Sequence, residues 1–256
     1  MDILVGVLIL FATLSGLAKV GFGFGAGIIL NPILTLFVSS ASAVTLLAPI
    51  LWFSNFTGAR SHRKSIQWDL IKKMLPMALT GTLLGSFVLS YVNDQLLRPS
   101  IGIIAITMGI LLFISRNKVK EDDDREEENQ ENIADQPKKR GIIYHLGAFI
   151  SGFVGATANS GGLPLIVLFM NDRTINKNAF TANIVVMLAI MDTIKIIFYM
   201  YFGILSIQNF LLVVLYIPFI YMGALGGKWV HNKISEKSFF KVVHSMIFII
   251  GILLLF

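Results

Sequence analysis

Three ionisable side chains stand inside apolar stretches of this sequence, where they could bind an anion or carry a proton: Lys19, Asp192 and Lys195. A charge within the hydrocarbon of a bilayer is costly, and it usually faces a charged partner or a water-filled cavity. Asp192 and Lys195 are three residues apart, so on a helix they share one face and can form an ion pair. Two interpretations of this pair remain open. Either Lys195 attracts an anionic substrate while Asp192 carries a proton or pairs with it, or the pair is purely structural. Lys19 directly precedes the first glycine-rich segment. It either attracts substrate, joins the same ion-pair or coupling chemistry, or extends to the membrane interface.

Two segments combine glycine and proline with neutral polar residues. The first covers residues 21–32 (GFGFGAGIILNP) and the second residues 156–164 (ATANSGGLP). Glycine and proline destabilise the interior of a helix, and the N-terminus of a broken helix presents free N–H groups that bind anions. The alternative is that the glycines only allow helices to pack closely. Together with Lys195, the predicted substrate-binding residues are Gly23, Gly25, Gly27, Asn31, Thr157, Asn159, Ser160, Gly161 and Gly162.

The composition indicates the environment in which such broken helices would stand. Of the 256 residues, 55% are hydrophobic and 14% are charged, whereas charged residues make up about a quarter of a soluble domain. Nine of the fifteen acidic residues lie within residues 116–140, which leaves too few charges elsewhere to cover a soluble surface. We therefore predict an all-α, polytopic membrane protein. The net charge of +6 fits positive cytoplasmic loops and the lipid bilayer better than a nucleic-acid partner.

The apolar stretches are long enough, or nearly so, to cross a bilayer, which takes about 20 helical residues. They are residues 3–18, 42–58, 70–91, 99–115, 141–156, 178–201, 208–230 and 239–256. If the glycine-rich segments 22–38 and 158–171 also cross, there are ten spans, and re-entrant hairpins are the alternative. With ten spans the basic residues of the loops collect on one side, so that both termini lie outside and the 116–140 linker lies in the cytoplasm.

The linker divides the chain into two parts. Residues 116–140 are highly charged and nearly free of apolar side chains, so they cannot bury enough surface to fold alone. We predict a flexible cytoplasmic linker between a first transmembrane repeat, residues 1–115, and a second, residues 141–256.

The two parts resemble each other in sequence. Residues 76–114 align without gaps to residues 218–256, with Gly81 opposite Gly223. Ser15-Gly16 likewise corresponds to Ser151-Gly152, just before each glycine-rich segment. About five spans in each repeat, an odd number, would give the repeats opposite orientations, with one short Gly/Pro-broken helix in each, as in many secondary transporters. Chance similarity between apolar helices is the alternative.

The two glycine-rich segments resemble those of the sulfite exporter TauE/SafE family of membrane permeases. Residues 23–27 (GFGAG) with Pro32 are similar to the family's first glycine cluster. Residues 159–162 (NSGG) match the second less completely, because the family often has more consecutive glycines there. The resemblance covers nearly the whole chain. It implies two similar halves joined by a cytoplasmic loop, and the transport of sulfur-containing anions such as sulfite or organosulfonates.

We therefore expect a secondary transporter of small anions in the cytoplasmic membrane. The expected substrates are sulfite, sulfonates or thiosulfate, moved by alternating access, with protons as a candidate coupling ion. The sequence contains no Cys and only four scattered His, so no metal site or cofactor is predicted. No Walker motif or hydrolase motif is present, so we do not expect an enzyme. The alternatives are a transporter of a non-sulfur anion, an anion channel and an intramembrane enzyme.

Overall fold

The computed structural model describes residues 2–23, 26–35, 37–92, 141–170, 172, 174–235, 238, 239, 241, 242 and 245. The predicted span 99–115, the linker 116–140 and most of the predicted span 239–256 lie outside the described residues. The predicted site residue Gly25 lies outside them as well.

The described part of the chain is helical and contains no strand. Its α-helices are α1 (Asp2–Phe22), α2 (Ala26–Leu34), α3 (Ser40–Ser61), α4 (Trp68–Tyr91), α6 (Ile142–Ala158), α7 (Gly162–Met170), α8 (Lys177–Tyr201), α9 (Ile207–Leu211) and α10 (Val213–Lys233), with a 3-10 turn η1 at Arg63–Ser65. Five segments are long and apolar enough to cross a membrane: Leu4–Phe22, Ser40–Ser61, Trp68–Tyr91, Lys177–Tyr201 and Ile207–Lys233. The apolar helix α6 is shorter than these. The prediction of an all-α, multi-pass membrane protein is therefore confirmed for the described residues.

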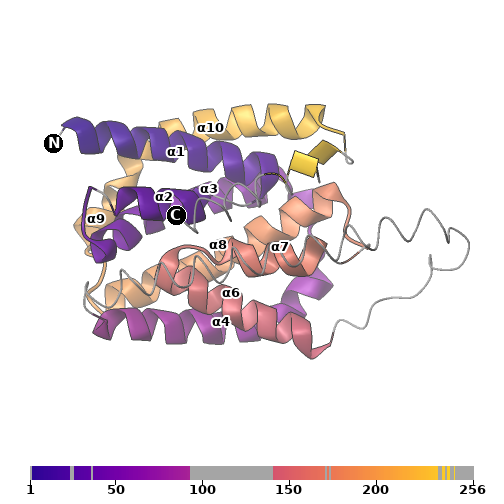
Figure 1. The fold of residues 1–256 in the computed structure, drawn as a ribbon, viewed down its shortest axis with the longest axis horizontal. Helices are drawn as coiled ribbons and strands as arrows, with labels where there is room; N and C mark the ends of the chain where they lie inside the picture. The colour runs from indigo at the N-terminus through magenta and orange to yellow at the C-terminus, as the bar shows by residue number, and fades with distance from the viewer. Residues whose placement is uncertain are drawn as a thin grey trace, which may run out of the picture.

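The helices form two outer pairs around a central pair (Figure 1). Helix α1 lies along α10, α4 lies along α6, and α3 and α8 lie between the two pairs. The central helices α3 and α8 are the most deeply buried of the candidate spans. The outer helices expose large apolar side chains, for example Leu10 on α1, Phe87 on α4 and Met222 on α10. An apolar exterior with the polar groups inside is what a bilayer requires.

Glycines bring the helices of each outer pair into close contact. A Cβ atom added to Gly81 of α4 would lie 2.1 Å from the carbonyl oxygen of Phe149 on α6. A Cβ atom added to Gly223 of α10 would lie 1.9 Å from the carbonyl oxygen of Thr13 on α1. Small residues at such crossings let helix backbones approach and pack in the absence of a hydrophobic driving force.

Hydrogen bonds at one end of the molecule show that α1, α3 and α10 run in the same direction. His62, which follows α3, contacts the carbonyl of Val20 near the end of α1 at 2.8 Å. His231, near the end of α10, contacts the carbonyl of Gly21 at the same distance. Lys177 at the start of α8 donates to the carbonyl of His231 at 2.5 Å, so α8 begins where the other three helices end.

Contacts at the opposite end show that α6 and α8 both end there. The hydroxyl of Tyr199, late in α8, donates to the carbonyl of Ala156 at the end of α6. Asn159, just beyond α6, donates to the carbonyl of Val44 early in α3, at 3.0 Å. Because α1 and α3 are parallel, α1 ends at one end of the molecule and α3 begins at the opposite end. Helices α6 and α8 are parallel too, so α6 ends and α8 begins at opposite ends, in the reverse sense.

Candidate functional site

A buried ion pair lies on α8, in the centre of the helix bundle. The ammonium nitrogen Nζ of Lys195 is 2.6 Å from Oδ1 of Asp192. Lys195 is 1% exposed and Asp192 is 6% exposed. The i, i+3 spacing places both side chains on the face of α8 that meets α3 and the end of α6, which is the pairing that the sequence predicts.

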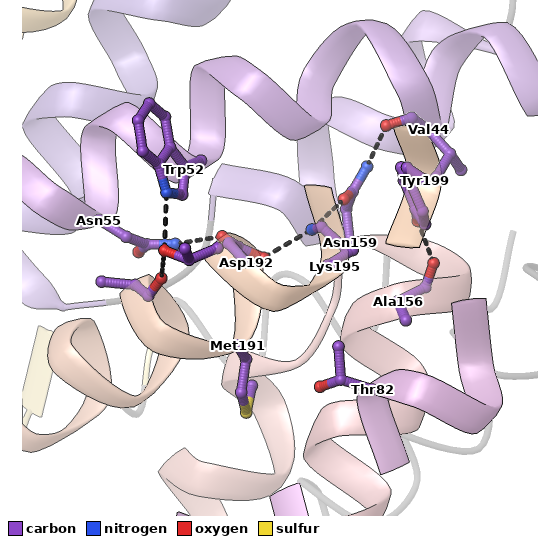
Figure 2. Close-up of polar contacts among 12 residues, drawn as sticks. Val44, Trp52, Asn55, Thr82, Ala156, Asn159, Met191, Asp192, Lys195 and Tyr199 are labelled. Carbon is purple, nitrogen blue, oxygen red and sulfur yellow. Dashed lines mark hydrogen bonds and ion pairs between the residues drawn. The ribbon is translucent and has the colours of Figure 1, made fainter. Parts of the chain in front are cut away.

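The ion pair belongs to a continuous chain of hydrogen bonds, which Figure 2 shows. The amide of Asn55 on α3 donates to Oδ2 of Asp192 at 2.7 Å. Lys195 donates to Oδ1 of Asn159 at 3.0 Å, and the amide of Asn159 donates in turn to the carbonyl of Val44. The chain thus links α3, α8 and the end of α6. Buried charges are stable only when paired and hydrogen-bonded in this way.

Asn159 separates α6 from α7. Its backbone is in the left-handed region, with φ 55° and ψ 21°, which asparagine and glycine adopt more readily than other residues. The chain turns there, and α7 starts at Gly162. The local backbone therefore aims the Asn159 side chain at Lys195 and Val44.

Gly23 occupies the corresponding place between α1 and α2. It has a φ of +83°, and an added Cβ would lie 3.0 Å from Cα of Thr181 on α8. Both the backbone conformation and the close approach of α8 require glycine here.

The two interrupted segments contact each other. A Cβ atom on Gly27, in the first turn of α2, would lie 2.0 Å from the carbonyl oxygen of Asn159. The amide of Asn31, one turn further along α2, donates to the carbonyl of Ala158 at 3.2 Å. The structure therefore brings Gly27 and Asn31 of the first segment against the end of α6, beside the Asp192–Lys195 pair.

Other predicted site residues have local roles. The hydroxyl of Thr157 donates to the carbonyl of Phe153, four residues earlier, and that of Ser160 donates to the carbonyl of Ala158. The carbonyl of Gly161 accepts a hydrogen bond from Ser151. The contact of Thr157 thus lies within α6, whereas Ser160 and Gly161 stabilise the break between α6 and α7 through contacts with backbone carbonyls.

Lys19 is buried, and its side chain has no hydrogen-bond partner in the described part of the chain. The residue is 5% exposed, and no hydrogen bond or ion pair joins its side chain to any described residue. The charges of Asp192 and Lys195 act on it electrostatically. The burial argues against the interpretation in which Lys19 extends to the membrane interface.

Asn55 is the contributor to the site that the sequence did not single out as a ligand. An asparagine in an apolar helix more often bonds to a neighbouring helix than to a substrate, and no local spacing connects it to Asp192. The sequence signal for Asn55 was that it is a polar residue within the predicted apolar span 42–58.

A second polar cluster lies where α1, α3 and α10 end. The rings of His62 and His231 lie 4.5 Å apart, and each contacts a carbonyl at the end of α1. Burial lowers the pKa of His62, and the charges of Lys177 and Lys228 lower it further, while the hydrogen bond to Val20 opposes the shift.

Comparison with known families decides the class of protein. The family model described as sulfite exporter TauE/SafE matches residues 8–254. The chain belongs to the TauE/SafE family. TauE/SafE proteins are membrane transporters, so this TauE/SafE protein is a permease and not an enzyme. Searches of curated proteins and of solved structures gave no match.

Proposed function

We propose that this TauE/SafE protein transports small sulfur-containing anions, such as sulfite, organosulfonates or thiosulfate, across the cytoplasmic membrane by alternating access. The observation that carries this proposal is the buried cluster of Lys19, Asp192 and Lys195 beside the two contacting helix breaks. Two cations and one anion leave one positive charge in this cluster. A charge buried in low dielectric is unstable without a partner, and an anionic substrate supplies one.

The helix breaks favour the same conclusion. α2 and α7 each begin directly after an interruption, and the N-terminus of a helix carries free N–H groups and a partial positive charge. In many transporters such half-helices meet near the middle of the bilayer and hold the substrate there. We propose that Gly23, Gly25, Gly27, Asn31 and residues 157–162 line this region.

Alternating access is supported by the relation between the two halves. Gly16 of α1 and Gly152 of α6, which the sequence aligns, make equivalent contacts. An added Cβ would lie 2.1 Å from the carbonyl oxygen of Ile220 in the first case and 2.0 Å from that of Ala78 in the second. We propose that the α1–α10 and α4–α6 pairs are equivalent parts of two inverted repeats, because α1 and α6 run in opposite directions. Rocking of one repeat against the other would expose the site to each side in turn.

The proposed orientation places both termini outside and the linker 116–140 in the cytoplasm, as the basic loops favour. A negative cell interior then drives the exit of an anion by about 2.3 kcal/mol per charge per 100 mV. Asp192 is the proposed proton carrier if transport is coupled to protons. A transporter of a non-sulfur anion is the second candidate, because the buried positive charge does not by itself specify sulfur.

The experiment is a flux assay with the purified full-length protein in proteoliposomes. Sulfite, thiosulfate, methanesulfonate, sulfate and acetate are compared under an imposed membrane potential. We expect potential-dependent flux of at least one sulfur anion and its loss in Lys195→Ala, whereas Lys72→Ala, which removes an exposed lysine of α4, retains it. Flux of acetate alone would favour the second candidate. Flux of none of the five would refute transport of small anions.

A further inference from the structure

We infer that Lys19 is the residue that binds the charge of the transported anion, that Lys195 is a positioning residue, and that the site therefore selects singly charged anions. This inference rests on the proposed transport of small anions. It specifies which lysine contacts the substrate and what charge the substrate carries.

The charge of Lys195 is already balanced. Its Nζ lies 2.6 Å from one carboxylate oxygen of Asp192 and donates to Asn159 at 3.0 Å. The other carboxylate oxygen of Asp192 accepts a hydrogen bond from Asn55 at 2.7 Å. An ammonium and a carboxylate in direct contact form a neutral unit, and Figure 2 shows this unit held between α3 and the end of α6.

The charge of Lys19 is not balanced in this way. The residue is 5% exposed, and no described residue forms a hydrogen bond or ion pair with its side chain. The sequence stretches 99–115 and 246–256, which lie outside the described residues, contain no acidic residue. An ammonium group has three N–H donors and no acceptor, so the partner that Lys19 lacks is an anion or another acceptor.

Lys19 stands at the first helix break. Its carbonyl accepts a hydrogen bond from the N–H of Gly23 at 3.0 Å, so it lies one helical turn before the point where α1 ends. Thr181 of α8 lies against Gly23, and its fully buried hydroxyl has no hydrogen-bond partner among the described residues. A lysine one turn before the break and a buried hydroxyl on the helix that packs against the break offer suitable donors for the oxygens of an anion.

The second half supports this direction for the Lys19 side chain. Ser15-Gly16 aligns with Ser151-Gly152, and the same register places Lys19 opposite Gly155. An added Cβ on Gly155 would lie 3.3 Å from Cα of Gly161, within the break between α6 and α7. A side chain at position 155 of α6 would thus point toward the break between α6 and α7. The matching position of α1 is occupied by Lys19.

The charge of the cluster defines the preferred substrate. With a singly charged anion bound at Lys19 the cluster becomes neutral, whereas a doubly charged anion leaves a net negative charge in a low dielectric. Methanesulfonate and methanedisulfonate test this directly, because they carry one and two negative charges at any ordinary pH. We expect kcat/KM of the wild-type protein in proteoliposomes to be at least about tenfold higher for methanesulfonate.

Four variants separate the roles of the two lysines. We expect Lys19→Met to lower methanesulfonate flux by at least about tenfold, the effect of losing a hydrogen bond to a charged group, and Lys19→Arg to retain more flux than Lys19→Met. Lys195→Met should also lose flux, because Asp192 then neutralises Lys19. The double variant Lys195→Met with Asp192→Asn should recover at least about tenfold over Lys195→Met, because it restores one positive charge.

The outcomes distinguish the inference from the proposed function. All variants are first shown to be monodisperse by size-exclusion chromatography. Wild-type flux of sulfite, thiosulfate or methanesulfonate that persists unchanged in Lys19→Met overturns the inference and leaves the proposed function standing. A double variant no better than Lys195→Met, or a wild-type preference for methanedisulfonate, also overturns it. Absence of wild-type flux for every sulfur anion refutes the proposed function itself.

Discussion

Asn55 and Asp192 meet in the centre of the molecule, where Nδ2 of Asn55 donates a 2.7 Å hydrogen bond to Oδ2 of Asp192. Each residue lies sixteen positions beyond the N-cap of its helix, Ser39 for α3 and Asn176 for α8. Equivalent positions of the two central helices therefore contact each other, one as an amide and one as a carboxylate. This hydrogen bond joins the first half of the chain to the second at Asp192, which is the ion-pair partner of Lys195.

The first prediction concerns this hydrogen bond. Asn55→Ala leaves one oxygen of a buried carboxylate without a donor, and we expect the free energy of unfolding to fall by about 1.5–3 kcal/mol. Thermal unfolding in detergent measures the change. Thr57→Ala is the matched control, because among the described residues the hydroxyl of Thr57 bonds only to the carbonyl of Phe53 on its own helix. Equal effects of the two substitutions would show that the contact with Asp192 contributes no stability.

The second prediction concerns the contact between the two interrupted segments. An alanine Cβ at Gly27 would lie 2.0 Å from the carbonyl oxygen of Asn159, so Gly27→Ala must push α2 away from the end of α6. We expect anion flux in proteoliposomes to be lost. Gly6→Ala in α1 is the control, because its added Cβ would meet no atom of another described helix within 4 Å, and there alanine should stabilise the helix by about 0.5–1 kcal/mol. Wild-type flux in Gly27→Ala would rule out this contact as part of the transport site.

The third prediction separates the backbone role of Asn159 from its side-chain role. Asn159→Gly retains the left-handed backbone and removes the hydrogen bonds to Lys195 and Val44. Asn159→Ala removes the same bonds and adds a steric cost of about 1–2 kcal/mol for the left-handed conformation. We expect both to lower the melting temperature, with alanine lower than glycine. If both variants melt at the same temperature, the left-handed turn is not constrained as the φ of 55° indicates.

The fourth prediction tests the equivalence of the two outer helix pairs. Gly81→Ala and Gly223→Ala each place a Cβ about 2 Å from a carbonyl oxygen of the neighbouring helix, so we expect similar losses of thermal stability from both. Gly226→Ala should be tolerated, because its Cβ would lie 3.8 Å from the nearest atom, in the side chain of Leu17. Unequal effects of Gly81→Ala and Gly223→Ala would argue against equivalent packing.

The fifth prediction concerns pH. Burial lowers the pKa of His62 below its ordinary value of 6.5, so the unfolded chain binds this proton more readily than the folded protein does. Stability is therefore greatest above pH 6.5 and decreases as the pH falls from 6.5 towards the folded pKa. We expect the melting temperature to decline in this range and the decline to be smaller in His62→Gln. An identical pH profile in wild type and His62→Gln would show that another group is responsible.

The sequence by itself determined the membrane class, the bounds of most described helices and the pairing of Asp192 with Lys195. Each of these depends on local features, because an apolar run of sufficient length partitions into lipid and residues three apart share a helix face. The glycine-rich segments were also recognisable, since the α1–α2 and α6–α7 interruptions fall at Gly23 and Asn159.

Only the tertiary structure decided which distant residues meet. Asn55 and Asp192 are 137 positions apart and Asn31 and Ala158 are 127 apart, and no local periodicity encodes such contacts. They depend on how α3, α8 and the two interrupted segments pack, where glycine allows an approach that a single Cβ would prevent. Packing likewise decided that Lys19, which reaches the cluster from α1, has no ion-pair partner among the described residues, whereas Lys195 shares α8 with Asp192.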